Sequence, residues 1–138
     1  MDSTEFDAAL DLVLEADSRY SRAAYQFVRE VLERSQIRQQ RKTSRKSTQV
    51  GVVELLQRIR IEALDQFGPM TCAVFEEWGI RSCEDFGEIV FNLMDRRIVE
   101  RGRRDRREDF RHGFDFTEAF CQPFEPIRRS RVSLVAIR

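Results

Sequence analysis

The sequence predicts a mainly α-helical fold of five helices with a small β-hairpin, whose C-terminal half is winged-helix-like. Apolar residues recur every three or four positions through most of the chain up to Met94, which is the spacing of helices with one buried face. After Met94, short apolar segments lie on either side of a charged stretch, as in a hairpin. A length of 138 residues with eleven Phe suits one hydrophobic core. We therefore expect a single globular domain over residues 1–126 and a basic tail over residues 127–138.

The N-terminal part, residues 3–34, is expected to form a pair of helices. Two stretches with helical apolar spacing are separated at Asp17 and Ser18. A short polar break between two amphipathic helices is typical of a helical hairpin or corner. The apolar positions are Phe6, Leu10, Val13 and Leu14 in the first stretch and Tyr20, Ala23, Ala24, Phe27, Val28, Val31 and Leu32 in the second.

Residues 35–50 are expected to form a basic loop or the frayed end of the preceding helix. The segment has five basic and no acidic residues, and Ile37 is the only large apolar residue up to position 49. Such a composition offers little to a core and indicates a boundary between two halves of one domain.

Residues 51–120 are expected to hold three further helices and the hairpin. Gly68 stops the third helix, and Pro69 suits the first turn of a fourth. Gly79 stops the fourth helix, and Ser82 begins a fifth with a capping box to Asp85. The apolar positions of these helices are Val52, Leu55, Leu56, Ile59, Ala63 and Phe67, then Cys72, Ala73, Phe75 and Trp78, then Phe86, Ile89, Val90, Leu93 and Met94.

The hairpin is placed after the fifth helix. Its first strand lies within residues 97–101, a charged loop follows over residues 102–109, and a returning strand begins at Phe110. In a winged-helix domain, helices 69–78 and 83–94 would form the helix-turn-helix, and the charged loop would be the wing.

The cysteines and the hydropathy pattern predict the compartment. Cys72, Cys83 and Cys121 include no closely spaced pair, so no disulfide framework or CxxC site is expected. No apolar run approaches the length of about 18 residues that a membrane span needs, and no signal peptide is visible. We therefore expect a reduced, cytoplasmic protein that does not contact membranes.

The sequence contains no recognisable catalytic constellation. His112 is the only histidine, and no ligand or catalytic partner stands at a recognisable spacing from it. The neighbouring acids Glu84 and Asp85 disfavour a thiolate at Cys83. We therefore expect no enzyme, no cofactor and no metal, unless catalytic residues converge only in three dimensions, for example His112 with Cys121.

Charge argues against the reading of DNA bases by the fifth helix. Glu84, Asp85 and Glu88 stand on its outward side, where phosphates would repel them. The basic residues of the 35–50 segment could instead contact phosphate without reading sequence. The candidate phosphate or anion contacts are Arg38, Arg41, Lys42, Arg45 and Lys46.

Seven short segments of the sequence together carry a resemblance to a known protein family. They are RY (19–20), AYQFVRE (24–30), FGPM (67–70), VFEEWGI (74–80), EDFGEIVFNL (84–93), REDF (107–110) and GFDF (113–116). Over about residues 6–124 the chain resembles a family of small conserved proteins from the Planctomycetes–Verrucomicrobia group of bacteria. The resemblance implies a bacterial, cytoplasmic protein. That family has no assigned activity, cofactor or catalytic residue, so no site residue follows from the resemblance.

Polar groups within these strings, together with the Phe-rich C-terminal end, indicate a candidate partner surface. Exposed Phe side chains would supply an apolar patch, whereas the polar side chains Asn92 and Asp109 could equally serve as local caps and turn bonds. The candidate surface consists of Asn92, Asp109, Phe114, Asp115 and Phe116.

Two functional hypotheses follow. The leading one is a non-enzymatic module that binds another protein, because catalytic motifs are lacking, the helices are acidic and the C-terminal end is rich in Phe. The alternative is a nucleic-acid- or ribosome-associated protein that binds without sequence preference through its basic loops.

Overall fold

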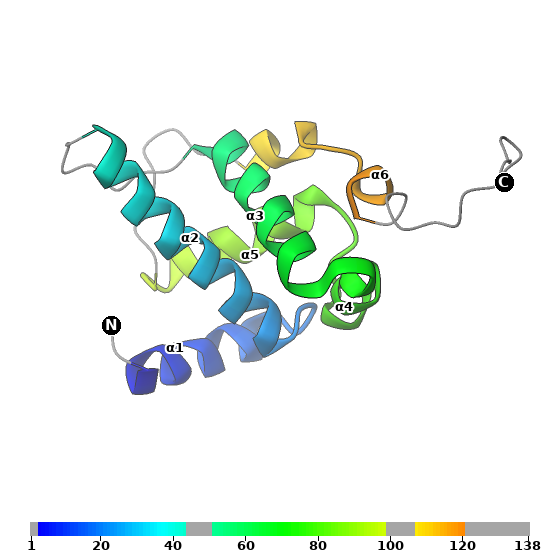
Figure 1. Cartoon of the computed structure of the whole chain (residues 1–138). Coiled ribbons are helices and arrows are strands. Elements are labelled where there is room, and N and C mark those ends of the chain that lie inside the picture. The colour runs from blue at the N-terminus through cyan, green and yellow to red at the C-terminus, as the bar shows by residue number, and fades with distance from the viewer. Residues whose placement is uncertain (1–2, 44–50, 99–106, 121–138) are drawn as a thin grey trace, which may run out of the picture.

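The computed structural model describes residues 3–43, 51–98 and 107–120, and these residues are helical, with no strand among them. The five longer helices are followed by the short α6 (Figure 1). Their bounds are α1 Ser3–Ala16, α2 Arg22–Thr43, α3 Val52–Phe67, α4 Thr71–Trp78, α5 Cys83–Asp95 and α6 Phe116–Phe120, with 3-10 turns η1 Gly68–Met70 and η2 Arg107–His112.

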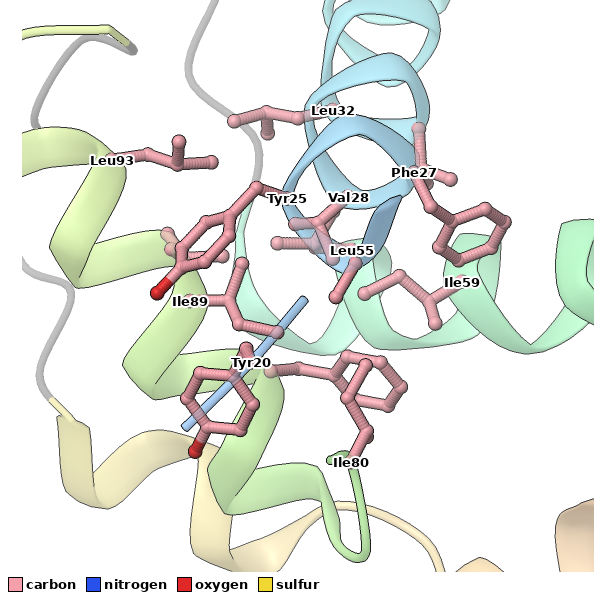
Figure 2. Packing of buried hydrophobic residues seen from close by; sticks show 14 of the residues in the cluster. Tyr20, Tyr25, Phe27, Val28, Leu32, Leu55, Ile59, Ile80, Ile89 and Leu93 are labelled. Atoms are coloured by element: carbon pink, nitrogen blue, oxygen red, sulfur yellow. The ribbon is translucent and has the colours of Figure 1, made fainter. Parts of the chain in front are cut away.

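The core lies where α2 packs against both α3 and α5. Figure 2 shows Val28 from α2, Ile59 from α3 and Ile89 from α5 pointing into the same space, and all three are fully buried. The apolar stripes of the sequence therefore face one another, so the hydrophobic effect joins segments that are far apart in the chain.

A cluster of aromatic rings joins α4 and α6 to this core. Phe75 of α4 is fully buried and lies at its centre. Its ring centroid is 5.9 Å from that of Phe27, 5.5 Å from that of Phe86 and 5.1 Å from that of Phe120. These edge-on contacts place the positive edge of one ring near the negative face of the next, which favours association beyond simple burial.

The expected ends of α4 and α5 are confirmed. Gly79 has a left-handed conformation with φ 87°, and the N–H of buried Ile80 donates to the carbonyl of Phe75 at 2.8 Å, as in a Schellman motif. The capping box at Ser82 is present, because the carboxylate of Asp85 accepts a hydrogen bond from the N–H of Ser82 at 3.1 Å.

Of the two alternatives for residues 35–50, a basic loop or the end of the preceding helix, residues 35–43 follow the second, because α2 continues as helix to Thr43. Gln, Arg and Lys are good helix formers, and no Gly or Pro interrupts residues 35–43. Ser35 is also buried, with 1% of its surface exposed, so the helix still faces the core at that position. Residues 44–50 lie outside the described part.

The predicted β-hairpin is wrong, and the winged-helix-like C-terminal half with it, since the described residues hold helices in its place. Ile98 was expected in a strand, but it completes a second Schellman motif at the end of α5. Its N–H donates to the carbonyl of Leu93 at 2.9 Å, and Arg97 takes the left-handed position with φ 58°. In the sequence, a single buried Ile that follows a helix end was therefore mistaken for part of a strand. Residues 99–106, including most of the expected wing, lie outside the described part.

The expected returning strand is likewise wrong, because Phe110 belongs to η2, which packs on α5. A methyl group at Gly87 in the middle of α5 would lie 2.8 Å from the Phe110 ring, so only glycine admits this close approach. Phe110 is buried and also contacts the ring of Phe91. The Phe spacing that suggested strand alternation thus comes from separate contacts of η2 and α6 with the core.

Candidate functional site

A group of hydrogen-bonded polar side chains joins the connection between α1 and α2 to one side of α5. We call it the polar cluster. It consists of Asp17, Arg19, Tyr20, Tyr25, Asp85 and Asn92.

One half of the polar cluster is centred on Asp85 in the first turn of α5. The hydroxyl of Tyr20 donates to Asp85 Oδ1 at 2.6 Å, across 65 positions of sequence. The other oxygen, Oδ2, accepts the N–H groups of Arg81 at 2.7 Å and Ser82 at 3.1 Å. Asp85 therefore both caps α5 and binds Tyr20 in the connection before α2.

The other half of the polar cluster is centred on Asn92, about two turns further along α5. Its Nδ2 donates to Asp17 Oδ2 and to the Tyr25 hydroxyl, both at 3.0 Å. Arg19 completes the arrangement, because its Nε donates to Asp17 Oδ1 at 2.9 Å. Figure 2 shows the side chains of Tyr20 and Tyr25 on the side of α2 that faces α5.

The environment keeps Asp17 ionised and the Tyr20 and Tyr25 hydroxyls protonated near neutral pH. Hydrogen bonds from Arg19 hold the pKa of the Asp17 carboxyl well below its usual range, against an opposing effect of burial. Burial raises the pKa of Tyr20, and the bond to Asp85 adds to the increase; burial also raises the pKa of Tyr25. A general acid or base needs a pKa near the working pH, so the shifted groups suit a structural clamp better than proton transfer.

A small groove lies beside Asp17 and Asn92, with a volume of about 220 Å³. Pockets that enclose small-molecule ligands usually measure roughly 300–1,000 Å³. Among the described residues, no three His, Cys, Asp or Glu side chains gather in a way that could hold a metal ion. The groove is lined by Val13, Ala16, Asp17, Asn92, Asp95 and Arg96.

The five residues of the candidate partner surface do not form one exposed patch. Asn92 bonds within the polar cluster, and Asp115 caps α6, because the N–H of Glu118 donates to its Oδ1 at 2.9 Å. Asp109 lies exposed on η2. Phe114 and Phe116 are half-buried, and each packs against the ring of buried Phe120. The Phe side chains therefore complete the core and leave little apolar area for a partner.

Two of the five candidate phosphate contacts have described side chains. Arg38 and Arg41 are exposed on the last turns of α2. Lys42 belongs to the same helix, and Arg45 and Lys46 lie outside the described residues. The structure thus places Arg38, Arg41 and Lys42 on a helix end rather than in a loop.

One helical turn before Arg38, Arg34 is exposed but paired with an acid of α3. Its Nε donates to Glu62 Oε1 of α3 at 2.8 Å. Arg58 of α3 lies 3.6 Å from the other carboxylate oxygen of Glu62, which is itself mostly buried. Arg34 and Arg58 thus share one internal acid, whereas Arg38 and Arg41 lie beyond it.

Cys83 and Cys72 differ in their oxidation state. Cys83 is a buried free thiol that donates to the carbonyl of Phe114 at 3.5 Å. Burial raises the pKa of the Cys83 thiol to about 11, which agrees with the expectation that it is a poor nucleophile. Cys72, in contrast, is disulfide-bonded. Cys121 lies outside the described residues, as do the tail residues 127–138.

Sequence reasoning missed most of the polar cluster. Tyr20 was assigned to an apolar stripe, and Asp17 to a break between helices. The available signal was the occurrence of polar and phenolic residues in the strings at 19–20, 24–30 and 84–93, which the fold brings together. Only Asn92 of this cluster was among the candidate site residues.

No family model matches the chain, and neither a curated protein nor a solved structure is significantly similar to it. The resemblance to the Planctomycetes–Verrucomicrobia family therefore stays a prediction. In the described part of the chain, none of the helices has the length and apolar character needed to cross a membrane.

Proposed function

We propose that the chain is a non-enzymatic binding module that contacts the phosphate backbone of nucleic acid through the basic end of α2. The observation that carries the proposal is the exposure of Arg38 and Arg41 and their lack of ion pairs within the described residues. Both are exposed, and no ion pair within the described residues includes either of them. Guanidinium groups that are not neutralised by the protein itself are suited to bind phosphate oxygens.

The helical setting supports this proposal. Positions 34, 38 and 41 share one face of α2, because they are four and three residues apart. Arg34 is occupied by Glu62, so the unpaired charge begins at Arg38 and continues toward the C-terminal end of the helix. Lys42, Arg45 and Lys46 follow in the sequence without an intervening acid.

Acidic side chains on α4 and at the start of α5 disfavour a wider contact with nucleic acid. Glu76 and Glu77 are exposed on α4, and Glu84 is exposed at the start of α5. Phosphates approaching these helices would be repelled. Binding is therefore confined to one basic end, and we expect it to be independent of base sequence and sensitive to salt.

The test is fluorescence anisotropy of labelled duplex DNA, single-stranded DNA and an RNA hairpin, titrated with the full chain at about 50 and 200 mM salt. The wild-type chain is expected to bind at the lower salt concentration and to weaken steeply at the higher one. Arg38→Ala together with Arg41→Ala is expected to reduce the slope of log affinity against log salt by about two, since each phosphate contact contributes about one. Alanine is a strong helix former, so α2 should persist.

A matched control removes the same charge from another place. Arg81 and Arg96 are exposed at the two ends of α5, and their joint replacement by alanine should leave binding within about twofold of the wild-type chain. Equal losses in both double variants would mean that only net charge matters. Absence of binding at the lower salt concentration would contradict the proposal outright.

A protein partner is the second candidate, and exposed apolar side chains on α3 favour it. Val53 is 76% exposed and Ile61 is 50% exposed, and they lie on one side of the helix with Gln57 between them. If a complex with a protein exists in the native cell, Val53→Glu with Ile61→Glu should abolish it. The Arg38→Ala and Arg41→Ala chain should retain that complex while losing nucleic acid.

A further inference from the structure

We propose that Glu62 of α3 restrains the basic end of α2 by holding Arg34 out of contact with phosphate. This inference rests on the proposed function, since it concerns how many arginines the same site offers to nucleic acid. Arg34 is then a third phosphate-binding residue that the folded chain keeps occupied. Glu62 is a positioning residue that sets the strength of binding.

Arg34 lies in line with the two arginines of the proposed site. It precedes Arg38 by four residues and Arg41 by seven, so the three side chains follow one another along one face of α2. Side chains four positions apart on a helix have Cβ atoms about 5–6 Å from each other. The Arg34 side chain is 47% exposed, so a ligand can reach its guanidinium group without opening the core.

An ion pair between two packed helices occupies Arg34. The helices α2 and α3 lie against each other (Figure 1). Arg34 Nε donates to Glu62 Oε1 at 2.8 Å, and its Nη2 contacts the same oxygen. This bond raises the pKa of Arg34 against an opposing effect of burial, so the pair favours the charged guanidinium. A phosphate must therefore displace a carboxylate that is already bound before Arg34 can add a contact.

Stability alone does not account for a carboxylate at position 62. Glu62 is only 9% exposed, and its buried Oε2 has no hydrogen-bond partner among the described residues. The nearest charge to that oxygen is Nη2 of Arg58, at 3.6 Å. Taking a carboxylate out of water costs free energy that an incompletely bonded pair recovers only in part. An apolar residue of similar size would avoid this cost, but it could not hold Arg34.

The first experiment compares the wild-type chain with Glu62→Gln by fluorescence anisotropy of labelled duplex DNA at about 50 and 200 mM salt. Glutamine keeps the length and helix propensity of glutamate but removes the charge that strengthens the bond to Arg34. The variant should bind about tenfold more tightly at the lower salt concentration. Its slope of log affinity against log salt should steepen by about one, because one phosphate contact is added.

A double variant assigns this gain to Arg34. Glu62→Gln together with Arg34→Ala should return the affinity and the salt slope to those of the wild-type chain. A gain that persists without Arg34 would overturn the proposal, since Arg58 or the change in net charge would then be its source.

Glu33→Gln is the matched control. Glu33 precedes Arg34 by one residue and pairs with Arg29 at 3.4 Å. Its replacement therefore makes the same change in net charge at the same level of α2 and leaves the bond between Arg34 and Glu62 in place. Binding should stay within about twofold of the wild-type chain. Equal gains in Glu33→Gln and Glu62→Gln would overturn the proposal.

A second experiment needs no variant of Glu62 to fold. Two-dimensional NMR follows the Nε–H signals of the arginines while duplex DNA is added to the wild-type chain. The signals of Arg38 and Arg41 should shift, whereas that of Arg34, which donates to Glu62, should keep its position. A shift of Arg34 as large as those of Arg38 and Arg41 would overturn the restraint.

The outcomes separate this inference from the proposed function. Wild-type binding that requires Arg38 and Arg41 but does not strengthen in Glu62→Gln would overturn the restraint and leave the proposed function standing. Binding by Glu62→Gln alone would support the restraint and contradict the proposed function of the wild-type chain. Absence of binding by both chains at the lower salt concentration would overturn both.

Discussion

The structural roles of several residues in this protein depend on contacts with residues that are distant in the sequence. Tyr20 is the clearest example, since its ring fills part of an apolar stripe while its hydroxyl donates to Asp85. Asn92 likewise faces a carboxylate and a phenol rather than solvent. A buried polar group costs free energy unless it is bonded, so these partners hold the connection before α2 against α5.

Gly79 gives a test at the residue scale. Its φ of 87° strains any other residue, and an added methyl group would lie 2.2 Å from the carbonyl oxygen of Arg19. We expect Gly79→Ala to lower the free energy of unfolding by about 2 kcal/mol or more, because backbone strain and the clash add. Urea unfolding followed by circular dichroism measures the change.

Gly51 is the matched control for this test. It precedes α3 with φ −68°, and a methyl group there would meet nothing within 4 Å. Gly51→Ala should therefore leave the free energy of unfolding unchanged or slightly raised. A similar small effect at both glycines would contradict the close approach of Gly79 to Arg19.

The lengths of the helices are set by residues that end a helix more than by the composition of the segments. α2 passes through a segment of polar and basic residues because nothing in it stops a helix. α4 and α5 both end in Schellman motifs, one at Gly79 and the other at Arg97. The second was not recognised in the sequence, because arginine is an unusual residue for the left-handed position.

Arg97 gives a test at the element scale. Its φ of 58° costs a residue with a side chain about 1 kcal/mol, whereas glycine adopts this conformation freely. Arg97→Gly should therefore raise the free energy of unfolding by roughly 0.5–1 kcal/mol, measured by urea unfolding. Arg96→Gly is the control, because the φ of Arg96 is −99° and glycine brings no relief there. If both variants were stabilised, the cause would be the loss of a positive charge and not the relief of backbone strain at position 97.

At the scale of the whole molecule, one aromatic cluster and one polar cluster connect the helices, and charge is distributed unevenly around them. The aromatic cluster gathers rings from α2, α3, α4, α5 and α6 around Phe75. Exposed acids occupy α4 and the start of α5, whereas exposed, unpaired arginines occupy the end of α2 within the described residues. The salt dependence of binding proposed above belongs to this scale, because it depends on where charge remains unneutralised.

The apolar spacing and the end signals were sufficient to place the helices of the first two-thirds of the chain. The stripes around Val28, Ile59 and Ile89 all became core, and the cap at Ser82 formed as expected. The C-terminal third was not predictable in the same way. Phe110, Phe114 and Phe116 were interpreted as a strand and as an exposed patch, because a short aromatic segment carries too few periods to distinguish these structures.

The sequence by itself therefore determined the helices of the first two-thirds of the chain, their buried faces and the position of the basic segment. These depend on residues within about four positions of one another, through periodicity, propensity and capping. The tertiary structure alone decided the polar cluster, the packing of η2 against Gly87 and the separation of Arg34 from Arg38. These depend on pairs such as Tyr20 with Asp85 and Asn92 with Asp17, which are 65 and 75 positions apart. No local pattern encodes such a meeting, because it forms only when the buried faces of separate helices come together.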